Sequence, residues 1–213
     1  MHTILGLSKT STSIAWVLVD ACDPTSEPLD QDAFDIIDSS AAAPAATARR
    51  VRDMAAASGW TVDAVHVTTS GNLSSLSEAL RDLTFDEVVP VSPADATRLW
   101  ALGGRQGSRR QNSAVCLLGH TSAALSVVDT CTGAMQSATT RVSGDSAALI
   151  GWLDTTLYGN GMRAELVYLI ASRRTRDALA GPLAARLSVP AVTSRHAQVA
   201  LARGAACVGA AAS

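Results

Sequence analysis

The chain has 213 residues with a formal net charge of -2, and 47% of its residues are hydrophobic and 17% charged. This composition is typical of a globular protein of one large or two small domains, and it excludes a strongly basic nucleic-acid-binding protein. No apolar run approaches the roughly 18 residues of a membrane-spanning helix, so we expect no membrane insertion.

The first half of the chain alternates between strand-like and helical patterns. Runs of apolar and β-branched residues predict strands, and apolar residues at helical spacing, flanked by proline, serine or glycine, predict helices. In chain order we expect strands at 4–7, 13–20 and 33–37, a helix at 44–58, a strand at 62–68, a helix at 72–83, a strand at 87–91 and a helix at 92–102.

The second half repeats the same order of patterns after a polar segment. We expect strands at 114–118, 123–130 and 134–142, a helix at 145–158, a strand at 165–170, a helix at 175–187, a strand at 189–192 and a helix at 196–210.

Both halves thus have the order β-β-β-α-β-α-β-α, which predicts an α/β protein built by internal duplication. We assign residues 1–104 to the first half, 105–112 to a polar linker and 113–213 to the second half. Gly6 and Gly119 are predicted to be equivalent. Two such halves are expected to flank a cleft, where ligands usually bind.

This repeated order resembles the duplicated ribonuclease-H-like fold of the actin, heat-shock chaperone and sugar kinase superfamily, with pseudo-two-fold symmetry and without large insertions. ILGLSKTSTSIAWVLVD resembles the first phosphate loop and AVCLLGHTSAALSVVD the second. FDEVVPVSPADATRLWALG resembles the connecting segment. LVYLIASRRTRDALAGPLAARLSVPAV, followed by QVALARGAA, resembles the adenosine motif and the last helix. Kinship with uncharacterised mycobacterial proteins that carry such a domain at their N-terminus is also predicted.

The resemblance implies that each phosphate loop brings an aspartate to the cleft to hold hydrated Mg²⁺ for phosphoryl transfer. Here Ser8 and Leu117 occupy those two positions. Thr10 and His120 replace glycines that would let backbone N–H groups approach a phosphate, and Ala171-Ser172 replaces the Gly-Gly of the adenosine motif. No catalytic residue and no metal ligand is therefore assigned, and ATP with Mg²⁺ is a doubtful cofactor.

The residues at these motif positions remain the candidates for binding. Ordinary alternatives are weighed for each type: hydroxyl side chains that cap their own turn, His120 as a turn residue, Asp145 as a helix N-cap, and Arg174 at a solvated helix start. The candidate cleft residues are Ser8, Lys9, Thr10, Gly119, His120, Thr121, Asp145, Ala171, Ser172 and Arg174.

The leading functional hypothesis is a degenerate actin-like pseudo-ATPase that acts as a protein-interaction or regulatory module. The alternative is a nucleotide-binding protein with weak or conformational use of ATP, and an active kinase or ATPase with an unusual catalytic set is a third. We expect a protein partner, no nucleic acid and a C-terminal continuation in the full-length protein. Four cysteines without C-x-x-C spacing, and the absence of a secretory signal pattern, predict a cytoplasmic setting.

Overall fold

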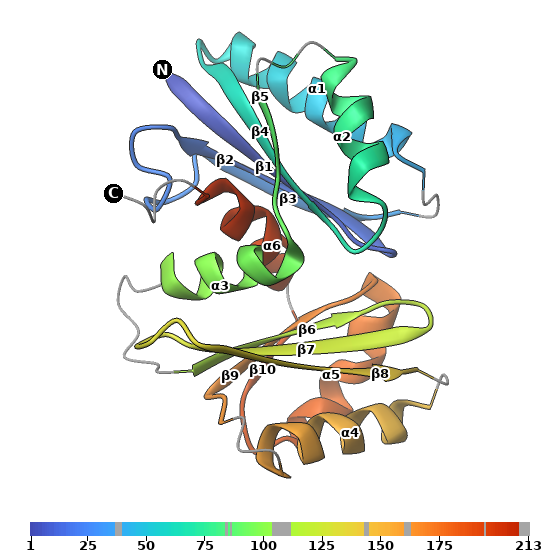
Figure 1. Cartoon of the computed structure of the whole chain (residues 1–213). Helices are drawn as coiled ribbons and strands as arrows, with labels where there is room; N and C mark the ends of the chain where they lie inside the picture. Colours follow the sequence, from blue (N-terminus) through green and yellow to red (C-terminus); the bar gives the residue numbers. More distant parts are fainter. Residues whose placement is uncertain are drawn as a thin grey trace. The chain divides into compact units, whose positions relative to one another are not determined.

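The computed structural model describes residues 1–36, 40–83, 85, 87–103, 112–142, 145–159, 163–193 and 195–208 (Figure 1). The chain divides into two compact units. The first comprises Met1–Gly103 with Val199–Ser213, and the second comprises Gly104–Gln198. The predicted linker 105–112 lies outside the described residues except for Asn112, which begins a strand.

The first unit contains a five-stranded sheet in the order β3-β2-β1-β4-β5. β2 runs antiparallel to both β1 and β3, whereas β1, β4 and β5 are parallel. Its elements are β1 (His2–Lys9), β2 (Ser13–Asp20), β3 (Asp30–Asp35), α1 (Ala42–Ala57), β4 (Thr61–Thr69), α2 (Leu73–Arg81), β5 (Glu87–Pro90) and α3 (Pro93–Gly103).

One face of the first sheet packs against α1 and α2 (Figure 1). Alternate strand residues such as Leu5, Leu7 and Val65 point to this face, as the period of two along a strand requires. They meet Val51 of α1 and Leu76 of α2, both almost fully buried. Burying each such side chain is worth about 1.5–3 kcal/mol, so this layer supplies much of the stability of the unit.

The opposite face of the first sheet is covered by the C-terminal helix α6 (Arg195–Ala206). From Val199 onward this helix belongs to the first unit, and its small residues Ala202 and Ala206 pack on Val17 and its neighbours in β2. The approach is close at Gly6, where an added Cβ would lie 2.1 Å from the carbonyl oxygen of Ala202. The packing units therefore do not coincide with the predicted sequence halves, in which α6 closes the second half.

The second unit has a five-stranded sheet in the order β10-β9-β6-β7-β8. Its elements are β6 (Asn112–Leu118), β7 (Ser122–Asp129), β8 (Met135–Arg141), α4 (Ser146–Gly159), β9 (Leu166–Ile170), α5 (Arg173–Arg186) and β10 (Ala191–Val192). With β6 matched to β1, the strands follow the same spatial order and directions as in the first unit. The predicted α/β duplication is confirmed. Leu153 of α4 and Leu179 of α5 pack on Cys116 and Leu125 of this sheet.

Two predicted helix signals are confirmed. Gly59, with a φ of +77°, follows α1, and the N–H groups of Gly59 and Trp60 donate to the carbonyls of Ala56 and Ala55. The Ser92 hydroxyl accepts from the N–H of Asp95 at the start of α3. Within the described part of the chain, no helix is long and apolar enough to span a bilayer.

Candidate functional site

The turn between β1 and β2 lies at the edge of the first sheet where its parallel strands end. Ser8 pairs with Thr68 and Lys9 with Thr69 across β1 and β4, so all four residues come to this edge. Ser8, Lys9 and Thr10 are buried, with exposed fractions of 2%, 9% and 9%. The structure thus gathers hydroxyl groups and a lysine where the resemblance predicts the first phosphate loop.

Thr10 organises this turn through its side chain and its backbone. Its Oγ1 accepts hydrogen bonds from the N–H groups of Ser13 (3.0 Å) and Thr12 (3.3 Å) and lies 2.9 Å from the Ser13 hydroxyl. Its own N–H donates to the Ser13 carbonyl (2.9 Å). Three N–H groups of the turn are therefore engaged internally, whereas a phosphate-binding loop needs N–H groups that face the ligand.

The turn between β6 and β7 is the corresponding feature of the second unit. The Gly119 N–H donates to the Ser122 carbonyl (2.8 Å), and His120 and Thr121 are exposed. Because Leu117 pairs with Ile170 across the parallel strands β6 and β9, the predicted residues Gly119 and Ala171-Ser172 lie at the same edge of this sheet.

The two turns correct the predicted equivalence of Gly6 and Gly119. The Thr10 N–H bonds the Ser13 carbonyl just as the Gly119 N–H bonds the Ser122 carbonyl, so Thr10 is the structural counterpart of Gly119. The strand pairings agree with this match. Ser8 pairs with the neighbouring parallel strand β4 and Leu117 with β9, and they lie two residues before Thr10 and Gly119, respectively. Gly6 instead lies within β1 under α6, where the absence of a side chain permits close packing.

The remaining candidates lie at helix starts in the second unit. Asp145 precedes α4, and its Oδ1 accepts from the N–H of Ala147 (2.8 Å). Ser172 is the N-cap of α5, with its Oγ accepting from the Thr175 N–H (3.2 Å). Arg174 is exposed on the first turn of α5. Asp145 and Ser172 therefore both serve as caps, the alternative weighed for Asp145 from the sequence.

Neither edge carries an acidic side chain at the position where the resemblance predicts one. Ser8 and the half-buried Leu117 stand at these predicted positions, and neither side chain is an anion that could hold hydrated Mg²⁺. Among the described residues, no group of three or more histidine, cysteine, aspartate or glutamate side chains is arranged to hold a metal ion.

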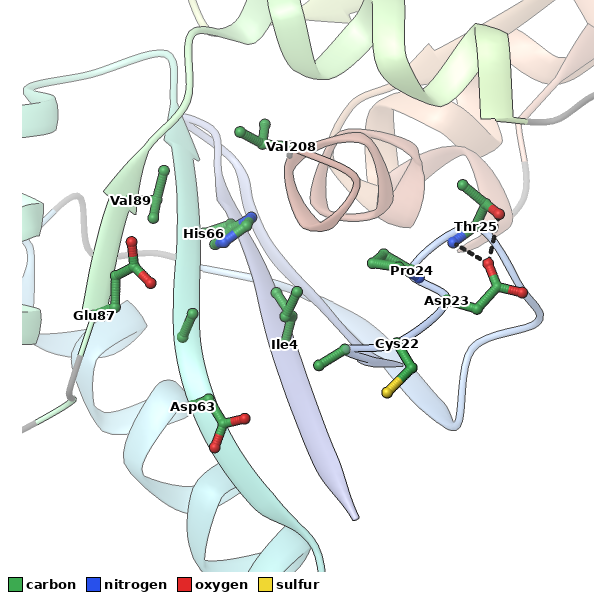
Figure 2. A pocket seen from close by; sticks show the side chains of 12 residues that line it. Ile4, Cys22, Asp23, Pro24, Thr25, Asp63, His66, Glu87, Val89 and Val208 are labelled. Carbon is green, nitrogen blue, oxygen red and sulfur yellow. Dashed lines mark hydrogen bonds between the residues drawn. The ribbon is translucent and has the colours of Figure 1, made fainter. Parts of the chain in front are cut away.

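The structure also has a cavity that sequence reasoning missed. It has a volume of about 670 Å³ and lies in the first unit, toward the amino ends of the parallel strands and away from the β1–β2 turn. Figure 2 shows the side chains that line it. Its walls include His66 and Asp63 from β4, Glu87 from β5 and Asp23 from the segment after β2. The sequence TVDAVHVTT gave an indication of it, because an aspartate and a histidine interrupt its run of valine and alanine.

His66 is the buried polar residue of this cavity, with an exposed fraction of 6%. Its Nδ1 lies 2.9 Å from the carbonyl oxygen of Ala205 in α6. Because a carbonyl can only accept, Nδ1 carries the proton, and Nε2 of the neutral ring is left as an acceptor. Burial lowers the pKa of His66, while the bond to Ala205 and the charge of Glu87 act in the opposite direction.

Comparison with known proteins identifies one sequence family. Residues 2–213 match the family described as "Family of unknown function (DUF7159)". No curated protein matches the chain.

Solved structures with the same fold include sugar kinases and an enzyme activator. The inorganic polyphosphate/ATP-glucomannokinase of Arthrobacter sp. strain KM superposes with a TM-score of 0.64 at 17% identity over 100% of both chains. The activator of the 2-hydroxyisocaproyl-CoA dehydratase of Clostridium difficile, solved with ADPNP, gives 0.62 at 11% over 96% of this chain and 92% of the activator. A Bacteroides thetaiotaomicron protein with an actin-like ATPase fold and unknown function gives 0.53 at 8% over 94% and 95%. At these identities the likeness establishes the fold, which is the predicted actin-like one.

Proposed function

The chain belongs to a family of unknown function (DUF7159) with the actin-like ATPase fold, and we propose that it is a degenerate, non-hydrolysing member that works by binding. In this proposal it serves as a protein-interaction or regulatory module. The partner is a protein, and neither ATP nor Mg²⁺ is required as a cofactor.

The observation that carries this proposal is the internally bonded β1–β2 turn. The N–H groups of Thr10, Thr12 and Ser13 are used within the turn, and the Thr10 hydroxyl accepts two of these three hydrogen bonds. Opening the turn for a ligand would break several buried hydrogen bonds, each worth about 0.5–1.5 kcal/mol. This cost opposes nucleotide binding before any contact with the ligand is made.

The replacement of the carboxylates supports the same conclusion for turnover. Phosphoryl transfer depends on positioned metal ions that neutralise the charge of the transferred group. A serine with an exposed fraction of 2% and a leucine stand at the two positions that bring carboxylates in the superfamily. Asp145, the one acidic residue among the predicted site residues, is engaged as a helix cap.

The alternative is nucleotide binding without turnover, and the second unit favours it. The Gly119–Thr121 turn, in which His120 and Thr121 are exposed, lies at the same sheet edge as the start of α5, where Ser172 caps the helix. A helix N-terminus attracts anions through its free N–H groups and its dipole. Two of the similar structures were solved with ADPNP or AMPPNP, the latter a glucokinase of Streptomyces griseus.

Calorimetry with ATP and Mg²⁺ separates the two proposals. The pseudo-ATPase proposal predicts a dissociation constant no tighter than about millimolar, equivalent to about 4 kcal/mol of binding free energy. A low-micromolar constant for any nucleotide would instead support the nucleotide-binding alternative. The thermal shift with saturating nucleotide is an independent readout, because a ligand that binds only the folded state raises the melting temperature.

A turnover assay then tests the absence of catalysis. It should contain ATP or polyphosphate as donor, glucose or mannose as acceptor, and also water alone, because the similar enzymes include an ATP/polyphosphate glucomannokinase and a glucokinase. We expect no rate above background. A Mg²⁺-dependent rate that disappears in Ser8→Ala or Asp145→Ala would overturn the proposal.

The finer expectations of the sequence remain part of this proposal. They are a cytoplasmic location and kinship with mycobacterial proteins. Affinity purification of the protein from a mycobacterial cytosol, followed by mass spectrometry, tests them together with the identity of the partner.

A further inference from the structure

We propose that the cavity at the amino edge of the first sheet binds a small organic cation, an ammonium or guanidinium group carried on a short apolar body. The site belongs entirely to the first unit and is independent of the predicted nucleotide loops. Its volume of about 670 Å³ lies within the range of roughly 300–1,000 Å³ that is typical of small-molecule sites.

The charges of the cavity select the sign of the ligand. Three acidic residues line it, Asp23, Asp63 and Glu87, and its lining contains no lysine or arginine (Figure 2). The neighbouring guanidinium of Arg203 is engaged with the carbonyl of Thr25 (3.0 Å). Asp63 is bonded to the exposed ring of His2 (2.8 Å), and Asp23 accepts from the Thr25 hydroxyl (2.7 Å). Within the described part of the chain the Glu87 carboxylate has no hydrogen bond or ion pair, so it is available to a cation.

His66 adds an independent feature that points to a hydrogen-bond donor. The residue is more than nine-tenths buried and lines the cavity. With Nδ1 engaged by the Ala205 carbonyl, Nε2 is an acceptor with no hydrogen bond among the described residues. Because Nε2 is accessible from the cavity and accepts no bond from the described residues, an N–H group of an ammonium or guanidinium can donate to it there.

The rest of the wall is apolar. Ile4, Val89 and Val208 contribute half-buried aliphatic side chains from β1, β5 and the residues after α6. A hydrocarbon body would cover these side chains while its charged end contacts Glu87 and His66. Mg²⁺ or Ca²⁺ would not use such a wall, because hard cations prefer several oxygen ligands, and the described residues offer no group of three metal-binding side chains.

Binding is tested by titrating ¹⁵N-labelled protein with three probes of one shape: 2-phenylethylammonium, 2-phenylethanol and 3-phenylpropionate. We expect saturable amide shifts around Thr25, His66 and Glu87 with the cation alone. Equal affinity for the neutral or anionic probe, no saturable shift, or shifts confined to the Gly119–Thr121 turn would overturn the proposal. Displacement of the cation by Mg²⁺ at matched ionic strength would also overturn it.

Matched variants show whether the carboxylates act locally. Glu87→Gln is expected to weaken binding at least ten-fold, and Val89→Trp to abolish it by filling the cavity, while the circular dichroism spectrum stays unchanged. Glu78→Gln removes an equal charge from the exposed side of α2 and is expected to change affinity less than two-fold. Equal weakening by Glu78→Gln and Glu87→Gln would show a general charge effect and contradict a site at this cavity.

Discussion

Gly204 provides the sharpest test of how α6 packs on the first unit. A Cβ added to this glycine would lie 1.7 Å from the carbonyl oxygen of Ala96 in α3 and 2.9 Å from the Cβ of Trp100. Ordinary van der Waals contacts of a Cβ begin at 3.4 Å. The first obstacle is backbone, so no side-chain rotation can relieve it, and α6 would have to move away from α3.

The magnitude follows from two opposing terms. Alanine is favoured over glycine inside a helix by about 1 kcal/mol, whereas overpacking a well-packed contact costs about 1–3 kcal/mol and occasionally more. Because the overlap at Gly204 is half of an ordinary contact distance and involves backbone, we place the cost at the upper end. Gly204→Ala should therefore lower the free energy of unfolding by about 2 kcal/mol, which corresponds to roughly 4–8 °C in melting temperature for a chain of this length.

Thermal unfolding followed by far-UV circular dichroism measures this effect. Gly151→Ala is the matched control, because Gly151 lies within α4 and has no atom within 4 Å of its would-be Cβ. It should raise the melting temperature by roughly 1–4 °C through helix propensity alone. If Gly204→Ala raised the melting temperature as Gly151→Ala does, the close contact between α6 and α3 would be refuted.

Two further predictions concern titration and thiol reactivity. Burial lowers the pKa of His66 from its ordinary value of 6.5, so the unfolded chain binds more protons than the folded one between the folded pKa and 6.5. The free energy of unfolding, measured by urea titration, should therefore fall as the pH drops below about 6.5. The variant His66→Asn keeps a donor for the Ala205 carbonyl and should remove this dependence on pH. An unchanged pH dependence in the variant would contradict the lowered pKa of His66. With an excess of 5,5′-dithiobis(2-nitrobenzoate) at neutral pH, the exposed thiols of Cys22 and Cys131 should react quickly. The buried thiols of Cys116 and Cys207 should react only after unfolding, and burial also raises the pKa of Cys116 to about 12. Fast reaction of all four thiols would contradict the burial of Cys116 and Cys207.

Much of the fold was predictable because local signals and tertiary packing agree. Strand β2 begins and ends at the predicted residues, and the helix predicted to start at Ser92 has a hydroxyl cap there. The helix predicted from Thr175 begins two residues earlier, at Arg173, because Ser172 caps it. β3 was predicted three residues too late, at Ala33 rather than Asp30, since its first residues are polar. Their pairing with β2, a tertiary contact, makes them part of the strand.

The candidate site was predictable only in part. The sequence identified the motif positions, and strand pairing places Ser8 and Leu117 at corresponding edges. It did not reveal that Thr10 closes its own turn, because a threonine in a turn can cap or can face solvent. The cavity around His66 could not be predicted from the sequence, because its walls come from segments that are far apart in the chain: β1, β4, β5, the segment after β2 and the residue Val208.

The position of α6 has a consequence for the order in which the protein folds during synthesis. The apolar sheet face that contains Val17 is made early, but the residues from Val199 onward that cover it emerge only after the whole second unit has been translated. Contacts this distant in sequence close slowly, and an uncovered sheet face is prone to aggregation in the meantime. The first unit is therefore begun first and completed last, and its nascent form presents a surface of the kind that chaperones protect.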